Sequence, residues 1–200
     1  MIINTGDCSN SLFYILSGSV AVIVEDSDSK EITLTYLNPS DFVGEMELFE
    51  ENPRSALIRA KTKCELGEIS YSKFFSLIAK HPEFIFAIAR QISMRLARTS
   101  RKACDLAFLD VGGRVASTLI DLCHEPDAQI KTNGTYLRIT RQEIARITGC
   151  SREMVGKILK DLAANQFISL HGKTIVVLNN NQQTLSIMPS KQALPKQRNV

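Results

Sequence analysis

The sequence predicts an α+β chain with a β-rich first part, one long helix, and a helical last part that ends in a β hairpin. Turn residues recur at short spacing through residues 1–70, and the hydrophobic period becomes that of a helix from Tyr71 onwards. Two short helical stretches then flank Gly149. We expect the parts to span 1–80, 81–109 and 110–178, followed by a polar, disordered tail at 179–200.

The β-rich part is typical of a small antiparallel barrel or jelly roll. Runs such as VAVIVE and EITLTYL have β-type composition, and the turns LSGS, EDSDSK and LNPSD separate such runs. Alternation places Val20, Val22 and Val24 on one face of a strand. Because the chain begins with the strand-like MIIN, we expect an opening element of this architecture to be missing.

A long helix is predicted from Pro82, a residue that suits the first turn of a helix. Apolar and small residues recur in it at spacings of three and four, which is typical of a narrow coiled-coil seam. A helix packed only on its own β part is the alternative, but the arginines beside the seam favour pairing with a second copy. The stretch FLDVGGR, with two glycines, predicts a break and a hinge. The seam consists of Ile85, Ile88, Ile92, Leu96, Thr99, Ala103 and Leu106.

The stretch ITRQEIARITGCSREMVGKILKDL predicts two short helices joined by a tight turn. Thr140 and Glu143 form a capping box for the first helix. Gly149 suits the positive φ of the turn, and Ser151 can cap the second helix. Polar Thr148 stands where such motifs usually bury an aliphatic residue. Since FISLHGKTIVVL predicts a following hairpin, the whole is typical of a helix-turn-helix with a wing.

The second helix of this pair predicts DNA binding, because Arg reads guanine and Glu accepts from cytosine in the major groove. Residues 138–173 hold seven Lys or Arg against three acids, as expected for a surface that faces phosphates. A purely structural helical hairpin is the alternative. We expect Val155, Ile158 and Leu159 to face inward, and Arg152, Glu153, Gly156, Lys157 and Lys160 to face out or toward a partner.

Several other classes of protein are not supported. No apolar run could span a bilayer and no leader pattern is present, so we expect a cytoplasmic chain with no membrane partner. The five cysteines form no CxxC pattern, so we expect free, mostly buried thiols and no metal site. The three histidines lack a carboxylate or cysteine at catalytic spacing, so we expect no enzyme.

Five stretches carry a family resemblance. DFVGEMELFEENPRSALIRAKT resembles the phosphate-binding cassette of cyclic-nucleotide-binding domains, and RLARTS, AFLDVGGRVA, ITRQEIARITGCSREMVGKIL and ISLHGKTIVV resemble the CRP/FNR transcription regulators. The resemblance runs from about Gly6 to Val177. It implies a cyclic-nucleotide-binding β jelly roll, a dimerisation helix and a winged helix-turn-helix. It also implies cyclic AMP as allosteric effector, a homodimer, and double-stranded DNA and RNA polymerase as partners.

The cassette has the chemistry that a cyclic phosphate needs, namely a cation and N–H donors in a concave turn. Arg54 would supply the cation and Ser55 hydroxyl and amide donors, while Gly44 permits a close backbone approach. Glu45 would accept from the ribose 2′-hydroxyl. If these residues are considered without the rest of the chain, the alternative to a nucleotide site is an ordinary loop with a surface ion pair.

Further roles come from the resemblance. Thr99, together with Ser100 of a second copy, would bond the adenine, and Arg95 would lie nearby. The ligand would favour one arrangement of the hinge, in which the two reading helices lie one DNA turn, or ~34 Å, apart. The residues that match the family at the hinge are Phe108, Asp110 and Gly113.

In the family, the positions of Arg152, Glu153 and Lys157 read a TGTGA-type half-site. Lys157 stands where relatives have Arg, and a Lys loses the bidentate fork on guanine. Glu47 occupies a place that is usually small and adds negative charge near the cassette. The residues expected at DNA are Thr140, Arg141, Gln142, Ser151, Arg152, Glu153, Lys157, His171 and Lys173.

Two alternatives stay open beside a cyclic-AMP-responsive activator. One is a CRP/FNR-type regulator with a different effector, or with none. The other is a cyclic-nucleotide-gated interaction module without DNA, which Arg152 and Glu153 argue against. The stretch DAQIKTNG overlies the family's polymerase-contact loop but differs from it in sequence, so activation rather than repression is open.

Overall fold

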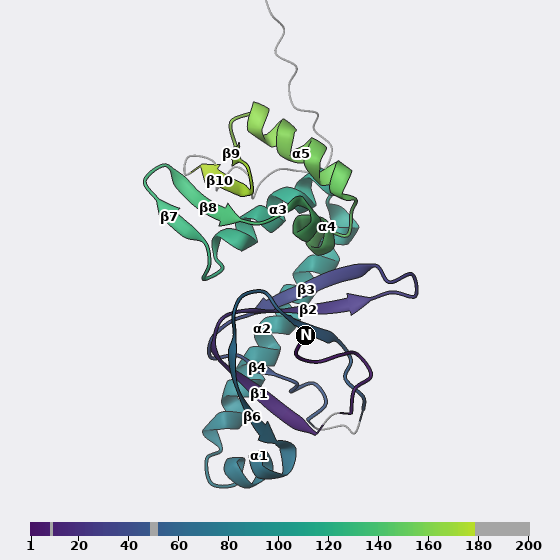
Figure 1. The fold of residues 1–200 in the computed structure, drawn as a ribbon, viewed down its shortest axis with the longest axis vertical. Helices are drawn as coiled ribbons and strands as arrows, with labels where there is room; N and C mark the ends of the chain where they lie inside the picture. The colour runs from purple at the N-terminus through teal and green to yellow at the C-terminus, as the bar shows by residue number, and fades with distance from the viewer. Residues whose placement is uncertain (9, 49–51, 179–200) are drawn as a thin grey trace, which may run out of the picture. The chain divides into compact units, whose positions relative to one another are not determined.

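The computed structural model describes residues 1–8, 10–48 and 52–178. The chain forms two compact units, Met1–Ser100 and Arg101–Val200, with the boundary inside the long helix α2 (Glu83–Phe108) (Figure 1). The predicted α+β class is confirmed, with a β-rich first unit and a helical second unit that contains the expected hairpin. The predicted tail, 179–200, lies outside the described residues.

The first unit contains two three-stranded antiparallel sheets, ordered β4-β1-β6 and β3-β2-β5. Their inward faces share a core of Ile15, Val20, Leu37, Val43 and Ile58. The strands are β1 (Ser11–Ser17), β2 (Val20–Glu25), β3 (Glu31–Leu37), β4 (Phe42–Val43), β5 (Leu57–Ala60) and β6 (Glu65–Ser70). The two-residue strand β4 was not predicted.

The predicted alternation in β2 is wrong beyond Val22. The pairing of β2 with β3 shifts register between Val22 and Ile23. Such an irregularity inserts a residue and turns the later side chains to the opposite face. Ile23 is therefore buried, whereas Val24 is exposed.

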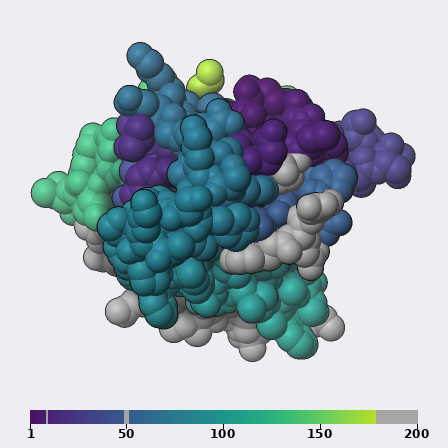
Figure 2. All heavy atoms as spheres, turned by 90° about the horizontal axis from the view of Figure 1, so that it is seen from below, coloured from purple at the N-terminus to yellow at the C-terminus, as the bar shows by residue number. Residues whose placement is uncertain are grey.

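Helices α1 (Tyr71–Ile78) and α2 follow the sheets, and the Ser70 side chain caps α1. Phe74 and Ile88 pack with Leu12 in a second core. The assignment of Ile88 to a seam facing a second copy is therefore wrong, because this side chain is buried in its own unit. Figure 2 shows the surface of this region, where the blue-teal atoms of α1 and early α2 form the centre of the face. The seam residues Ile85, Leu96 and Leu106 are exposed.

The second unit packs three helices with a four-stranded antiparallel sheet, ordered β7-β8-β10-β9. Val115, Leu119, Ile144, Val155 and Leu159 are among its buried residues. Its elements are α3 (Val111–Cys123), β7 (Gln129–Lys131), β8 (Gly134–Arg138), α4 (Arg141–Thr148), α5 (Arg152–Ala164), β9 (Ile168–His171) and β10 (Thr174–Leu178).

The sequence indicated that two glycines make the break between α2 and α3. The structure shows that they do not. Helix α2 ends at Phe108, and Asp110 caps α3 by accepting a hydrogen bond from the Gly113 amide at 2.8 Å. Gly112 and Gly113 lie inside the first turn of α3. The carboxylate of Asp110 therefore starts the new helix.

The five thiols are free, but the expectation that most are buried is wrong. Cys8 and Cys104 are exposed and the other three are partly exposed. Within the described part of the chain, no group of three His, Cys, Asp or Glu side chains could hold a metal ion. No described helix combines the length and the apolar character that a membrane span requires.

Candidate ligand pocket and nucleic-acid interface

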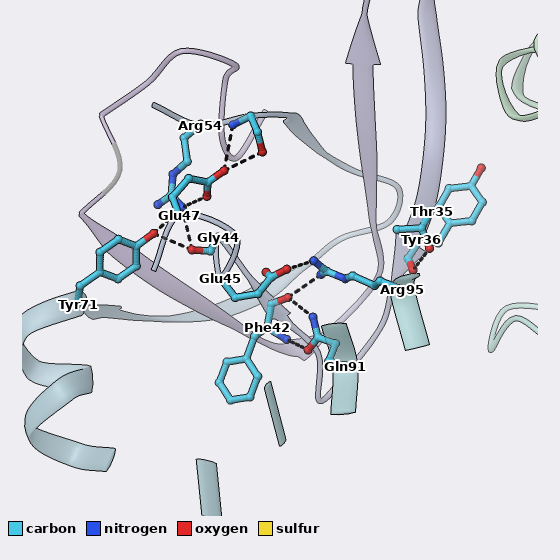
Figure 3. Close-up of polar contacts among 11 residues, drawn as sticks. Thr35, Tyr36, Phe42, Gly44, Glu45, Glu47, Arg54, Tyr71, Gln91 and Arg95 are labelled. Carbon is cyan, nitrogen blue, oxygen red and sulfur yellow. Dashed lines mark hydrogen bonds and ion pairs between the residues drawn. The ribbon is translucent and has the colours of Figure 1, made fainter. Parts of the chain in front are cut away.

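Five of the predicted ligand residues line one pocket in the first unit. Figure 3 shows the polar contacts of Gly44, Glu45, Arg54 and Arg95. Gly44 and Glu45 directly follow β4, Arg54 and Ser55 precede β5, and Arg95 comes from α2. The cavity volume is about 40 Å³. That is room for a few water molecules.

Arg54 is held by several hydrogen bonds in the pocket, and only 5% of it is exposed. Its Nη2 donates to the Ser11 carbonyl, and its Nη1 donates to the Gly44 carbonyl at 3.2 Å and the Tyr71 hydroxyl at 3.1 Å. Gly44 has a φ of +85°, and a Cβ there would collide with the Arg54 guanidinium. Glycine is therefore required at position 44, both for its positive φ and because the Arg54 guanidinium leaves no room for a side chain.

The Glu47 carboxylate contacts the same residues that the sequence assigns to a phosphate. The Ser55 amide and hydroxyl donate to Glu47 Oε1 at 3.0 and 2.8 Å, and Arg54 Nη1 donates to Oε2 at 3.3 Å. Glu47 is 7% exposed. The negative charge expected near the cassette thus belongs to a carboxylate that accepts hydrogen bonds directly from the cassette's donors.

Glu45 and Arg95 form a second ion pair in the pocket. Burial raises the pKa of the Glu45 carboxyl, and the Arg95 charge opposes that shift. Arg95 also donates to the Phe42 carbonyl at 2.9 Å. Among the described residues, Glu45 Oε2 and Arg95 Nε are buried without a hydrogen-bond partner. The pocket therefore has one spare acceptor and one spare donor, which fits a polar ligand such as a nucleotide.

Thr99 and Ser100 do not line the pocket. Both are exposed on α2, one helical turn beyond Arg95. Tyr71 and Gln91 support the pocket and were missed by the sequence analysis. The Tyr71 hydroxyl donates to the Gly44 carbonyl at 2.6 Å, and the Gln91 amide bonds both the N–H and the carbonyl of Phe42 at 2.7 Å. No local pattern indicates either contact, since each joins residues far apart in the chain.

The helix-turn-helix forms as predicted. Thr140 and Glu143 make a capping box, Gly149 has a φ of +65°, and Ser151 caps α5 by accepting from the Met154 amide. Buried Thr148 is tolerated because its hydroxyl donates to the Ile144 carbonyl at 2.8 Å. The residues expected at DNA are all exposed: Thr140, Arg141, Gln142, Ser151, Arg152, Glu153, Lys157, His171 and Lys173.

One expectation for α5 is wrong. Gly156 is buried, although it was expected to face out. A Cβ at this position would lie 3.6 Å from the Arg141 guanidinium at the start of α4. That distance is an ordinary van der Waals contact, so position 156 faces Arg141 but has room for a Cβ.

One unit is a β domain with a pocket of paired charges, and the other is a helix-turn-helix unit with an exposed basic face. This combination defines a transcription regulator with a ligand-binding domain. Residues 1–81 match the cyclic nucleotide-binding domain family, and residues 113–182 match the Crp-like helix-turn-helix domain family. The chain belongs to the CRP family of transcriptional regulators.

Three relatives illustrate the similarity. The cAMP-activated global transcriptional regulator CRP of Salmonella typhimurium is 52% identical over 177 residues, covering 88% of this chain and 84% of that protein. The cAMP-activated regulator Vfr of Pseudomonas aeruginosa is 51% identical over 180 residues, with the same coverage. The structure of the c-di-GMP responsive global regulator CLP of Xanthomonas campestris has a TM-score of 0.83 and 44% identity, and the match covers 89% of each chain.

Proposed function

We propose that this chain is a cyclic-AMP-responsive transcription regulator that binds palindromic TGTGA-like DNA as a homodimer. One observation carries the effector assignment: two guanidiniums and two carboxylates from three separate segments line one pocket that has a spare buried donor and acceptor. The cAMP-activated relatives CRP and Vfr support the same effector. A regulator of this kind acts on the chromosome, so the proposal places it in the cytoplasm with RNA polymerase as a partner.

In this proposal, Arg54 and Ser55 hold the cyclic phosphate and Glu45 accepts from the ribose 2′-hydroxyl. These roles use a guanidinium, an amide and hydroxyl, and a carboxylate that already lie together. Thr99 of one copy and Ser100 of the second copy bond the adenine, and the exposure of both residues on α2 supports this role.

The homodimer is supported by apolar side chains that α2 leaves exposed. Ile85 is 44% exposed, Leu96 66% and Leu106 60%. Pairing of two such helices would cover them. The switch would act at Phe108, Asp110 and Gly113, where α2 gives way to α3, and would set the spacing of the two α5 helices.

A second candidate is a CRP-type regulator with a different effector, or with none. Glu47 favours it, because this carboxylate uses the donors that a phosphate needs. The c-di-GMP responsiveness of CLP shows that an effector other than cyclic AMP occurs in a similar protein. Isothermal titration calorimetry with cyclic AMP distinguishes the two candidates. If the folded protein gives no heat of binding, the first candidate is refuted.

The DNA-reading role is tested with a double variant in which Arg152 and Glu153 are both replaced by Ala. Each lost base contact should cost about 1–3 kcal/mol of discrimination, so the preference for a TGTGA palindrome over a scrambled duplex should disappear. Fluorescence anisotropy measures both affinities, and titration calorimetry should show unchanged cyclic AMP binding. Lys160→Ala, an exposed change on the same helix, is the control that keeps the preference. A double variant that still prefers the palindrome would contradict the assignment.

A further inference from the structure

We propose that Glu47 is the residue that sets the nucleotide affinity of the pocket, because its carboxylate occupies the phosphate donors and must be displaced for a phosphate to bind. This inference rests on the proposed function and deepens it. It makes Glu47 an internal competitor of the effector.

The contacts of Glu47 resemble those expected of a bound anion. Both carboxylate oxygens are used, one by the Ser55 amide and hydroxyl and the other by the Arg54 guanidinium. The side chains of Glu47 and Arg54 are only 6% and 5% exposed. Charge-assisted hydrogen bonds of this kind are the strong class in proteins, and a carboxylate is a natural substitute for a phosphate oxygen pair.

The Nη1 group of Arg54 leaves little capacity for a further anion. Its two N–H bonds are shared by the Gly44 carbonyl, the Tyr71 hydroxyl and Glu47, while Nη2 donates to the Ser11 carbonyl. Among these partners, Glu47 is the one with a negative charge. A phosphate can therefore reach Arg54 and Ser55 most directly by replacing the Glu47 carboxylate.

The charge of the pocket leads to the same conclusion. Its described lining contains two carboxylates, Glu45 and Glu47, and two guanidiniums, Arg54 and Arg95. A cyclic phosphodiester adds one negative charge to this balanced set, which is unfavourable in a site shielded from water. With Glu47 neutral or turned outward, the pocket would hold one excess positive charge.

The small size of the cavity agrees with such a rearrangement. A volume of about 40 Å³ admits a few water molecules, whereas a nucleotide needs several times more space. Glu47 lies in a tight turn in which the Leu48 amide donates to the Glu45 carbonyl at 3.2 Å. Outward rotation of its side chain would enlarge the pocket and free the donors in one movement.

The test replaces Glu47 with Gln in the full chain and measures cyclic AMP binding by isothermal titration calorimetry. The amide keeps the size of the side chain but loses its charge, so we expect roughly tenfold or greater tightening of Kd. Glu65→Gln is the matched control, because Glu65 is exposed and outside the pocket lining, and its Kd should equal that of the unmodified chain. Glu47→Gly is a second variant that removes the side chain altogether.

The possible results separate this inference from the proposed function. If the unmodified chain and both Glu47 variants bind cyclic AMP equally, Glu47 does not set the affinity, although the effector stands. If none of them binds, cyclic AMP is not the effector, and inorganic phosphate becomes the probe of Glu47. A rise in Tm with phosphate in the two Glu47 variants, but not in the unmodified chain, would support the inference, and equal or absent shifts would overturn it. Failure of both variants to fold would also overturn it, because a displaceable carboxylate cannot be required for the fold.

Discussion

Two carboxylate–guanidinium pairs, Glu45–Arg95 and Glu47–Arg54, lie in the pocket of the first unit. Buried pairs of this kind recover through attraction only part of what the loss of water costs them. The sequence allowed Arg54 and Ser55 to be assigned as anion donors, because a cation beside a hydroxyl after a turn has that chemistry. It indicated that Glu47 adds negative charge near them, but not that its carboxylate contacts them, since the direction of that side chain depends on how two loops meet.

The raised pKa of Glu45 predicts a pH-dependent difference in stability. A carboxyl whose pKa in the folded state exceeds its ordinary value of 4.5 contributes stability below pH 4.5, and that contribution is lost as the pH rises through the folded-state pKa. In Glu45→Gln this loss is absent. The unmodified chain should therefore lose stability relative to Glu45→Gln between pH 4 and pH 7, as urea unfolding would measure. A relative gain over that interval would mean that attraction to Arg95 outweighs the burial.

The helix ends show which elements a sequence can specify. Capping at Thr140 and Ser151 was predicted, because a cap involves only residues three apart. The irregularity at Val22 and the burial of Ile88 were not predicted, since both depend on a neighbouring element. Local chemistry thus fixed helix starts, whereas the exposed face of α2 became clear only in the structure.

The exposed stripe of α2 predicts that Leu96→Glu disrupts a homodimer. The change places two like charges in the proposed helix pair, and we expect the dimer Kd to rise roughly 100-fold or more. Sedimentation equilibrium over a range of protein concentrations measures this change. Met94→Glu is the control: Met94 is also apolar and exposed, but two residues away, about 200° around the helix. Equal effects of the two changes would contradict the proposed seam.

At the scale of the whole molecule, the chain combines a charged pocket in one unit with a DNA-reading helix in the other. The order of these parts was predictable from the sequence, because each has its own motif and hydrophobic period. The pocket and the DNA-reading helix are coupled if binding at one changes the free energy of binding at the other. The ligand can act on DNA binding only to the extent that it binds two arrangements of the chain unequally.

The most direct measurement of that coupling is the Kd for a palindromic TGTGA duplex with and without saturating cyclic AMP, at one fixed salt concentration. We predict that cyclic AMP lowers this Kd by about 5- to 150-fold. Because the coupling is reciprocal, the duplex should lower the product of the two cyclic AMP dissociation constants of the dimer by the same factor. Equal duplex affinities with and without bound cyclic AMP would contradict the account.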